Sequence, residues 1–448
     1  MEQSDARHTL HAFRNSLYEC FDRRADALFE LTDSILTADV VPSPVHLSLE
    51  LAHRRSWGSL YAALSRGQID EDALRKLVVH HPLLEERPTT PVYAVDVSVW
   101  SRCDAEASPE RGYYYHPSRH SAGQPIVAGW AYQWIAQLGF ARDGWVAPMD
   151  IERVRPVQNP NEVAAEQVKR LLQRLPQREK EAPLFVFDAG YDPVQLQQGV
   201  EDHRVQILIR LRAGRCFYAD PPPPKRTGRP PRHGPKLDTK EPRTWPTPSA
   251  EHSCEDAGYG TVRVRAWAGL HPKTQDHPTR GTRRPRPIVR GTLVLVEVSH
   301  LPRPTREPRK LWLWWAGPRQ PDLRLLWRAY VRRFDLEHTF RFLKQTLGWT
   351  TPRVRHPQQA DLWSWLVLAA FTQLRLARPY VADRRLPWER RYAPGCLTPL
   401  RVRRGVLALL LEVGTPAKPP KPCGRSPGRP KGRRSGRARR YPAIKKSS

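Results

Sequence analysis

The sequence has few cysteines, and none of them is paired in a motif. The six cysteines are scattered and form no C-x-x-C pair or Cys/His spacing, so the sequence predicts neither a zinc module nor a disulfide framework. The sixteen histidines show no H-x3-H or H-E-x2-H pattern, which gives no argument for metal binding by imidazole. The expected compartment is a reducing one, the cytoplasm.

Long apolar runs are also missing. The N-terminus, "MEQSDARHTLHAFRNSL", has no apolar signal core. The longest apolar stretch, "LWSWLVLAAF" at 362–371, is too short to span a bilayer. This stretch is therefore predicted to be a buried helix.

Basic residues are abundant. The chain has 448 residues, a net charge of +29 and 39% hydrophobic residues, which is enough for two or three domains with a real core. An excess of positive charge this large is typical of proteins with a polyanionic partner, most often nucleic acid. The alternative is a ribosome-like or membrane-surface protein.

Hydrophobic periodicity divides the chain into regions. Helical spacing dominates the first eighty residues, and strand-like alternation then follows at 91–100, with a strand pair expected at 124–140, a buried strand at 182–192 and a further strand at 205–218. The segment 161–175 has the spacing of a crossover helix, which predicts a mixed α/β core. The predicted regions are a helical N-terminal DNA-binding domain at 1–85, a first core part at 90–218, a β-rich insertion with basic Pro-rich loops at 219–318, a second core part with C-terminal helices at 319–413, and a disordered basic tail at 414–448.

The C-terminal part repeats the helical pattern. Helices are expected at 322–347, 358–378 and 398–412. The tail has twelve Lys and Arg and no acid. Such a segment cannot bury a core and should be disordered when free.

Three acidic residues stand where charge is least expected. Asp96 interrupts a Val-rich strand, Asp188 ends "LFVF", and Glu337 lies between Phe334 and Phe340 on a predicted helix. A buried carboxylate needs a cation or hydrogen-bond donors, so each one alone is read most simply as a salt bridge or a cap. Together, in a basic α/β protein, they are what a magnesium-dependent site for phosphodiester cleavage requires.

The helix around Glu337 adds a second pattern. Tyr330, Arg333, Glu337 and Lys344 follow the spacing Y-x2-R-x3-E-x6-K and fall within one 60° stripe of a helical wheel, at about 100° per residue. A helix beside a metal site and a DNA backbone would place its acid on the metal and its cations on phosphates.

This stretch, "YVRRFDLEHTFRFLK", resembles the signature of bacterial insertion-sequence transposases of the DDE class. The wider chain is similar to a group of actinobacterial transposases through "VYAVDVSVW", "VFDAGYD", "LWLWWAG" and "FDLEHTFRFLKQTLGWT". The resemblance implies an RNase H-like catalytic core with a β-rich insertion before the glutamate. It also implies that Asp96, Asp188 and Glu337 bind two Mg²⁺ ions, with Mn²⁺ as a substitute, and that Tyr330, Arg333 and Lys344 handle DNA near the cut.

Other residues are weaker candidates. Arg210 and Arg212 alternate with leucines in "ILIRLR", so at least one of them is expected to face the site or the phosphates. An equal alternative is that both lie on a strand face exposed to solvent. Arg341 is a further candidate for DNA binding, although it is near enough to Glu337 for a local salt bridge. Asp104 is the nearest substitute for Asp96, and Asp192 is expected to be a helix cap.

Two tryptophans in the insertion, Trp245 and Trp267, are in the region where related transposases hold a flipped base. An aromatic residue in such a segment is more often part of a core. Neither is therefore assigned to the site.

Three functions remain open at this stage. The first is a DDE transposase that binds terminal inverted repeats, cleaves them and joins them to target DNA, working as a homodimer or higher multimer in the cytoplasm, at the nucleoid. The second is a catalytically inactive DNA-binding relic. The third is an RNase H-like nuclease without strand transfer, which only the Y-x2-R-x3-E-x6-K stripe separates from the first.

Overall fold

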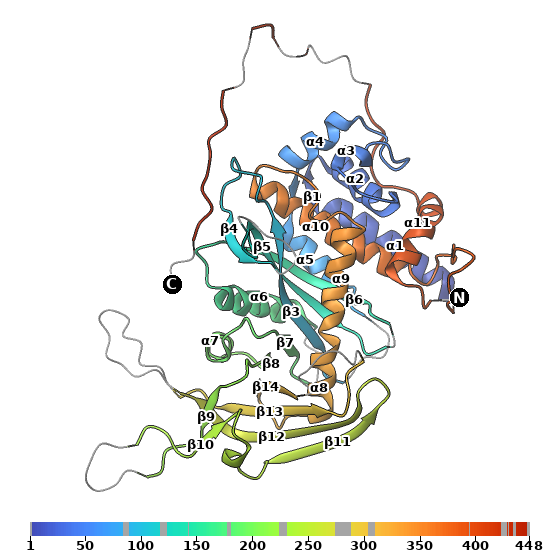
Figure 1. Ribbon diagram of the computed structural model, residues 1–448. Helices are drawn as coiled ribbons and strands as arrows, with labels where there is room; N and C mark the ends of the chain where they lie inside the picture. Colours follow the sequence, from blue (N-terminus) through green and yellow to red (C-terminus); the bar gives the residue numbers. More distant parts are fainter. Residues whose placement is uncertain are drawn as a thin grey trace. The chain divides into compact units, whose positions relative to one another are not determined.

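A computed structural model of the chain describes residues 2–83, 89–116, 123–141, 143–176, 181–223, 231–273, 288–302, 310–393, 395–422, 428, 430–432 and 436–445. The chain forms two compact units, each assembled from separate segments. The first unit contains Met1–Glu86, Val97–Asn159 and Asp335–Ser448, and the second contains Arg87–Asp96 and Pro160–Phe334. The predicted N-terminal helices therefore share a unit with the C-terminal ones and with several strands (Figure 1).

Helices form most of the first unit. They are α1 (Glu2–Glu19), α2 (Ala25–Thr37), α3 (Pro44–Leu47), α4 (Trp57–Arg66), α5 (Glu71–Val79), α9 (Phe334–Gln345), α10 (Pro357–Ala377) and α11 (Pro399–Val413). Helix α10 contains the apolar stretch 362–371, and it is buried as predicted, in contact with α1, α2 and α11. No helix among the described residues has the length and apolarity needed to cross a membrane.

A buried polar network links the ends of this unit. Arg14 is 1% exposed and its guanidinium donates to Asp33 Oδ1 and to Gln373 Oε1, both at 2.7 Å. The buried arginine is stable there because charge-assisted hydrogen bonds satisfy it. The network fixes α1 and α2 against α10.

The strands of the first unit differ in part from the prediction. The segment 124–140 forms one long strand, β5 (Ile126–Leu138), and not a pair. It pairs with β4 (Gly112–Tyr115) through its first residues and with β6 (Val146–Val154) through the rest, and a small ladder joins β1 (Phe21–Arg23) to β2 (Gln68–Ile69). The pattern missed β4 because it is only four residues long, and β6 because proline and charged residues interrupt its alternation.

A mixed sheet forms most of the second unit, with the strand order β10-β9-β12-β13-β14-β8-β7-β3. The strands β3 (Val92–Ser101), β7 (Leu184–Phe187) and β8 (Gln206–Arg210) run parallel, and α6 (Pro160–Arg174) precedes β7 as predicted. Their near-continuous runs of apolar residues are typical of strands buried on both faces. The predicted strand 205–218 is divided into β8 and β9 (Cys216–Tyr218).

The insertion is β-rich, as predicted. Its strands are β10 (Lys236–Asp238), β11 (Ala250–Asp256), β12 (Gly260–Pro272), β13 (Gly291–Val298) and β14 (Lys310–Ala316). Figure 1 shows β11, β12 and β13 side by side, and their ladders are antiparallel. A Cβ atom at Gly291 would lie 2.3 Å from the Trp314 ring, so the close approach of β13 and β14 requires glycine there. Most of the basic Pro-rich loops lie outside the described residues.

The predicted helix 322–347 is two helices. Helix α8 (Leu323–Arg332) ends where α9 begins, and Arg333 between them is outside both. The helical wheel that placed four signature residues on one stripe assumed an uninterrupted helix. Arg333 keeps helical dihedral angles (φ −54°, ψ −32°), and it is buried, whereas Glu337 is exposed.

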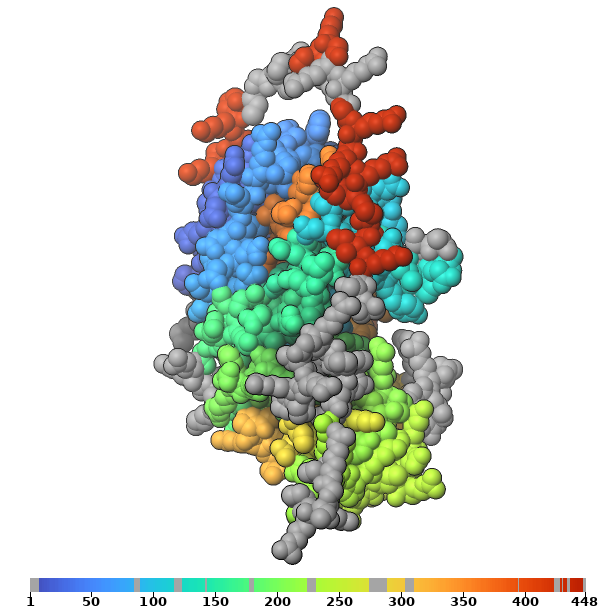
Figure 2. Space-filling model, turned by 90° about the vertical axis from the view of Figure 1, so that its left-hand side faces the viewer, coloured from blue at the N-terminus to red at the C-terminus, as the bar shows by residue number. Residues whose placement is uncertain are grey.

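The basic tail was expected to be disordered when free, but several of its described residues contact the first unit. Gly414 O accepts a hydrogen bond from Arg14 Nη2 at 2.9 Å. Farther along, the backbone N–H of Tyr441 donates to Glu106 O at 2.8 Å and that of Ile444 to Arg111 O at 2.7 Å. In Figure 2 these last residues (red) run beside the cyan residues that accept their bonds.

Candidate active site

Two of the predicted acids occupy neighbouring positions on adjacent parallel strands. Val95 on β3 is in register with Phe187 on β7, and Asp96 and Asp188 are the next residue of each strand segment. Neighbouring strands are about 4.8 Å apart, and residues at one level of a parallel pair point to the same face of the sheet. The register therefore brings the two carboxylates together in the second unit.

Arg210 is at the same level on the third parallel strand. Phe187 is in register with Ile209 on β8, so Arg210 follows at the position beside Asp188. Its Nη1 atom is 3.9 Å from Asp188 Oδ1. Three parallel strands thus place the sequence of charges acid, acid and base in one row.

Arg333 closes the row from the end of α8. Its side chain is 2% exposed, and Nη1 donates to Asp96 Oδ2 at 2.9 Å while Nη2 is 3.9 Å from Asp188 Oδ1. The guanidinium carbon lies 5.6 Å from the ring centre of Tyr330 and 5.0 Å from that of Phe334, within the range of cation–π attraction. A single buried cation therefore neutralises part of the charge of both aspartates.

Tyr191 is a member of this cluster that the sequence analysis did not assign. It follows the turn after β7, where its N–H donates to Asp188 O at 3.3 Å, and it is 6% exposed. Burial holds the pKa of its hydroxyl well above the usual value near 10, and the carboxylates of Asp96 and Asp188 raise the pKa further. Its place in "DAGYD", next to the second acid, was the available signal.

Tyr330 packs against the same arginine. It is 3% exposed, and its burial raises the pKa of the phenol, while Arg333 and Arg210 nearby lower it. Arg212 is exposed beyond the end of β8. Its predicted role at the site or on phosphates stays a prediction.

Glu337, Arg341 and Lys344 are on α9 in the first unit. Glu337 was expected to be a charge buried between Phe334 and Phe340, but its side chain is exposed. Arg341 is exposed as well, whereas Lys344 Nζ donates to Val99 O at 3.2 Å on β3. The approach of these three residues to the two aspartates stays a prediction.

The donor atoms of the row fit a hard divalent cation. Asp188 Oδ1 is buried, yet it accepts no hydrogen bond from the described residues, since its arginine neighbours are 3.9 Å away. Carboxylate oxygens are the ligands that Mg²⁺ and Mn²⁺ take in proteins. Across the described ranges, no group of three or more His, Cys, Asp and Glu side chains is arranged to hold a metal ion.

The weaker candidates have structural roles. Asp192 caps α7 (Pro193–Gly199), because its carboxylate accepts from the N–H groups of Val194 and Gln195, both at 3.0 Å, as predicted. Asp104 is exposed outside the strand.

Trp245 and Trp267 belong to an aromatic cluster of the insertion. Trp267 is 3% exposed, its ring centre lies 5.9 Å from that of Trp245, and each indole N–H donates to a backbone carbonyl. Both tryptophans also pack against Trp312. These contacts agree with the interpretation that the two side chains are part of a core.

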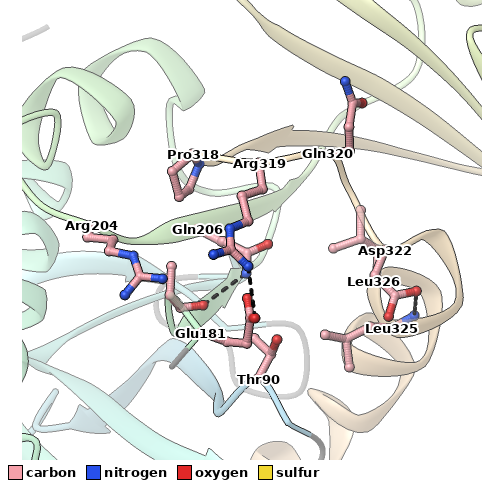
Figure 3. A pocket seen from close by; sticks show the side chains of 11 residues that line it. Thr90, Glu181, Arg204, Gln206, Pro318, Arg319, Gln320, Asp322, Leu325 and Leu326 are labelled. Carbon is pink, nitrogen blue, oxygen red and sulfur yellow. Dashed lines mark hydrogen bonds and ion pairs between the residues drawn. The ribbon is translucent and has the colours of Figure 1, made fainter. Parts of the chain in front are cut away.

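A separate pocket of the second unit lies at the other end of the parallel strands. Figure 3 shows Thr90, Glu181 and Gln206 on its wall, and these residues precede or begin β3, β7 and β8. Arg319 Nη1 pairs with Glu181 Oε1 at 2.9 Å across it. Since Asp96 and Asp188 follow the opposite ends of their strand pairing, this pocket is not part of the carboxylate row.

Comparison with known proteins adds a family. The model of the DDE superfamily endonucleases matches residues 16–273, a range that includes Asp96, Asp188 and Arg210. No curated protein matches the chain. Among solved structures, the piggyBac transposase synaptic complex with hairpin DNA is similar with a TM-score of 0.40 and 10% identity, over 87% of this chain and 70% of that one, a likeness too distant to support a functional argument.

Proposed function

Because the chain belongs to the DDE superfamily endonucleases, we propose that it is a transposase that cleaves DNA at the ends of an insertion sequence and transfers the cut strands to target DNA. Its catalytic core in this proposal is RNase H-like. The observation that carries the proposal is the row of Asp96, Asp188 and Arg210 at one level of three parallel strands, closed by Arg333. Carboxylates beside fixed cations are suited to phosphodiester chemistry.

The two aspartates would hold the metal. Asp96 and Asp188 offer oxygens from adjacent strands, and Asp188 Oδ1 has an unused acceptor position among the described residues. When bound, two Mg²⁺ ions, or Mn²⁺ in their place, activate the attacking oxygen and stabilise the leaving one. Glu337 is the third ligand in this proposal.

The cations of the row would hold the DNA backbone. Arg210 is 42% exposed as a side chain, so it can reach a phosphate while it remains near Asp188. Arg333 is fixed by its rings and by Asp96. Its guanidinium would orient the Asp96 carboxylate, and the ring of Tyr330 would hold the guanidinium in position. Arg341, Lys344 and Arg212 would bind phosphates farther from the cut.

The partners follow from the proposed reaction. Two transposon ends must be cut and joined together, so the working form is a homodimer or higher multimer on DNA. The helices α1–α5 would recognise the terminal inverted repeats. The basic tail would add affinity for any DNA sequence.

Cleavage and joining of a DNA fragment with the inverted repeats of the element, in Mg²⁺, test the proposal. Asp188→Asn and Glu337→Gln should each lower the rate of cleavage by at least about a hundredfold, more than the loss typical of groups that only support a metal ligand. Asp192→Asn is the matched control, because asparagine also caps a helix, and it should cleave like the wild type.

Each other outcome points to a different function. If Asp188→Asn and Glu337→Gln cut as well as the wild type, the metal assignment fails. Cleavage without joined product by the wild type would identify a nuclease without strand transfer. Binding of the repeats without any cleavage would identify an inactive relic.

A further inference from the structure

A groove in the first unit lies among α3, α4 and the segment before α10. It has a volume of about 340 Å³, and its walls include residues 42–44, Tyr61, Leu64, Arg353, Arg355 and Gln359. This volume is at the lower end of the range for ligand sites in proteins. All these residues belong to the first unit, so the groove shares no residue with the carboxylate row.

One wall of the groove is aromatic and exposed. On α4, Tyr61 is 45% exposed and Trp57 is 63% exposed, and their ring centres are 6.3 Å apart in an edge-to-face arrangement. Both side chains are one helical turn apart, so they form one outward face. Large exposed aromatic residues next to a groove commonly mark a binding surface.

Another part of the lining, called here the cationic wall, contains Arg353 and Arg355. Arg353 and Arg355 are exposed, and none of the described residues that line the groove is acidic. The groove also meets the first turn of α10, a helix of 21 residues, whose N-terminus carries a partial positive charge. Burial is the main cause that lowers the pKa of the nearby Arg102; Asp104 raises this pKa, and Arg111 and Arg353 lower it further. Positive charge is therefore in excess here, which favours an anionic ligand.

The cationic wall is held in place by the fold. Gly348 has φ +68°, and a Cβ atom there would lie 2.6 Å from Val41 Cβ, so glycine lets the chain after α9 pass close to residue 41. Arg102 donates to Val354 O, and the Gln359 side chain accepts from the N–H groups of Arg355 and His356 at 3.2 and 3.0 Å. A preorganised wall loses little entropy on binding.

We propose that this groove binds an unpaired nucleotide of DNA, with its phosphate on Arg353 and Arg355 and its base stacked on Tyr61. Charge complementarity selects a polyanion, and exposed aromatic rings beside a basic groove are the features by which proteins bind single strands. The inference rests on the proposed function, in which the ends of cut DNA must be held. It assigns to the N-terminal helices a second site, apart from the cleavage centre.

Fluorescence anisotropy with a labelled single-stranded DNA of twenty nucleotides tests the inference over a series of salt concentrations. Arg353→Ala combined with Arg355→Ala should reduce the slope of log affinity against log salt by about 1.4, which is 0.7 for each phosphate contact. Tyr61→Ala should weaken binding about 5-fold to 150-fold with an unchanged slope, and Tyr61→Phe should bind like the wild type.

The matched control removes the same charge elsewhere. Arg390 and Arg391 are exposed and lie outside the groove, so their double substitution by alanine should lower affinity much less than the groove pair. Equal losses for the two pairs would overturn the site, because they would reflect net charge alone. If the groove variants lost affinity only for duplex DNA, and Tyr61→Ala did not change affinity for the single strand, the proposal of an unpaired nucleotide as the ligand would be overturned.

The cleavage assay separates this inference from the proposed function. If the groove variants lose single-strand binding while the wild type never cuts DNA, the groove stands and the transposase proposal fails. If the wild type cuts and joins ends but the groove variants bind the single strand normally, the transposase proposal stands and the groove inference fails. A melting temperature equal to that of the wild type shows that the fold of each variant is intact.

Discussion

The buried arginine of the carboxylate row provides a quantitative test of the site. Arg333→Gln removes the 2.9 Å ion pair with Asp96 and leaves two neighbouring carboxylates without their shared cation. Removing one partner of a fully buried pair costs about 3–5 kcal/mol. The Asp96 and Asp188 side chains are 18% and 40% exposed, so solvent screening reduces this to roughly 2–3 kcal/mol.

The expected loss appears in thermal unfolding. For a unit of this size, 1 kcal/mol corresponds to about 2–4 °C, so the melting temperature of Arg333→Gln should fall by about 4–12 °C. Magnesium should restore part of it, because an ion that binds only the folded state at a hundred times its Kd stabilises by about 2.7 kcal/mol. The wild type should gain less, since Arg333 already balances the carboxylates.

Two controls make the result specific. Arg341→Gln removes an exposed arginine of α9 and should change the melting temperature by no more than about 2 °C. Asp96→Asn added to Arg333→Gln should recover stability, because it removes the repulsion between the carboxylates. The reasoning is refuted if Arg333→Gln melts like the wild type and responds to MgCl2 no more than to NaCl of equal ionic strength.

Two further predictions concern other parts of the chain. Burial, Arg375 and, least of the three, His80 lower the pKa of His81 to about 4. This histidine therefore contributes stability that is complete above its unfolded pKa near 6.5 and is lost as the pH falls toward 4. In urea unfolding over this window, His81→Gln should flatten the pH dependence of the free energy of unfolding by at most about 1.4 kcal/mol per pH unit, and His80→Gln should flatten it much less. Deletion of residues 414–448 should lower affinity for all DNA sequences and reduce its salt dependence, and a loss confined to one sequence in competition binding would contradict a non-specific role.

Local patterns predicted many of the elements but not their pairing. Alternation located β3, and helical spacing located α6 and α10, because each of these elements has a long periodic stretch. The ion pair of Arg333 with Asp96 could not be predicted, since the two residues are 237 positions apart in the sequence.

The candidate site was predictable in its residue types and not in its geometry. Asp96 stands out as a charge inside a Val-rich strand and Asp188 as a charge at the end of an apolar run, but only the parallel register of β3 and β7 shows that they are at one level. The resemblance implied that Arg333 handles DNA, which stays a prediction, but its burial at 2% exposure could not be read from the helical spacing. Tyr191 was missed because a tyrosine after a turn has no distinctive spacing.

The assembly of the first unit from three segments has a consequence for protein synthesis. The Arg14 side chain donates hydrogen bonds to Asp33 and to Gln373, which lies 359 residues later in the sequence. Helix α2 packs against α10 and α11. The ribosome therefore releases the whole second unit before α10 and α11, which pack against the first helices, exist. We expect nascent chains that stop near residue 334 to expose the apolar faces of α1 and α2 to chaperones, and longer chains that include α11 to bury them.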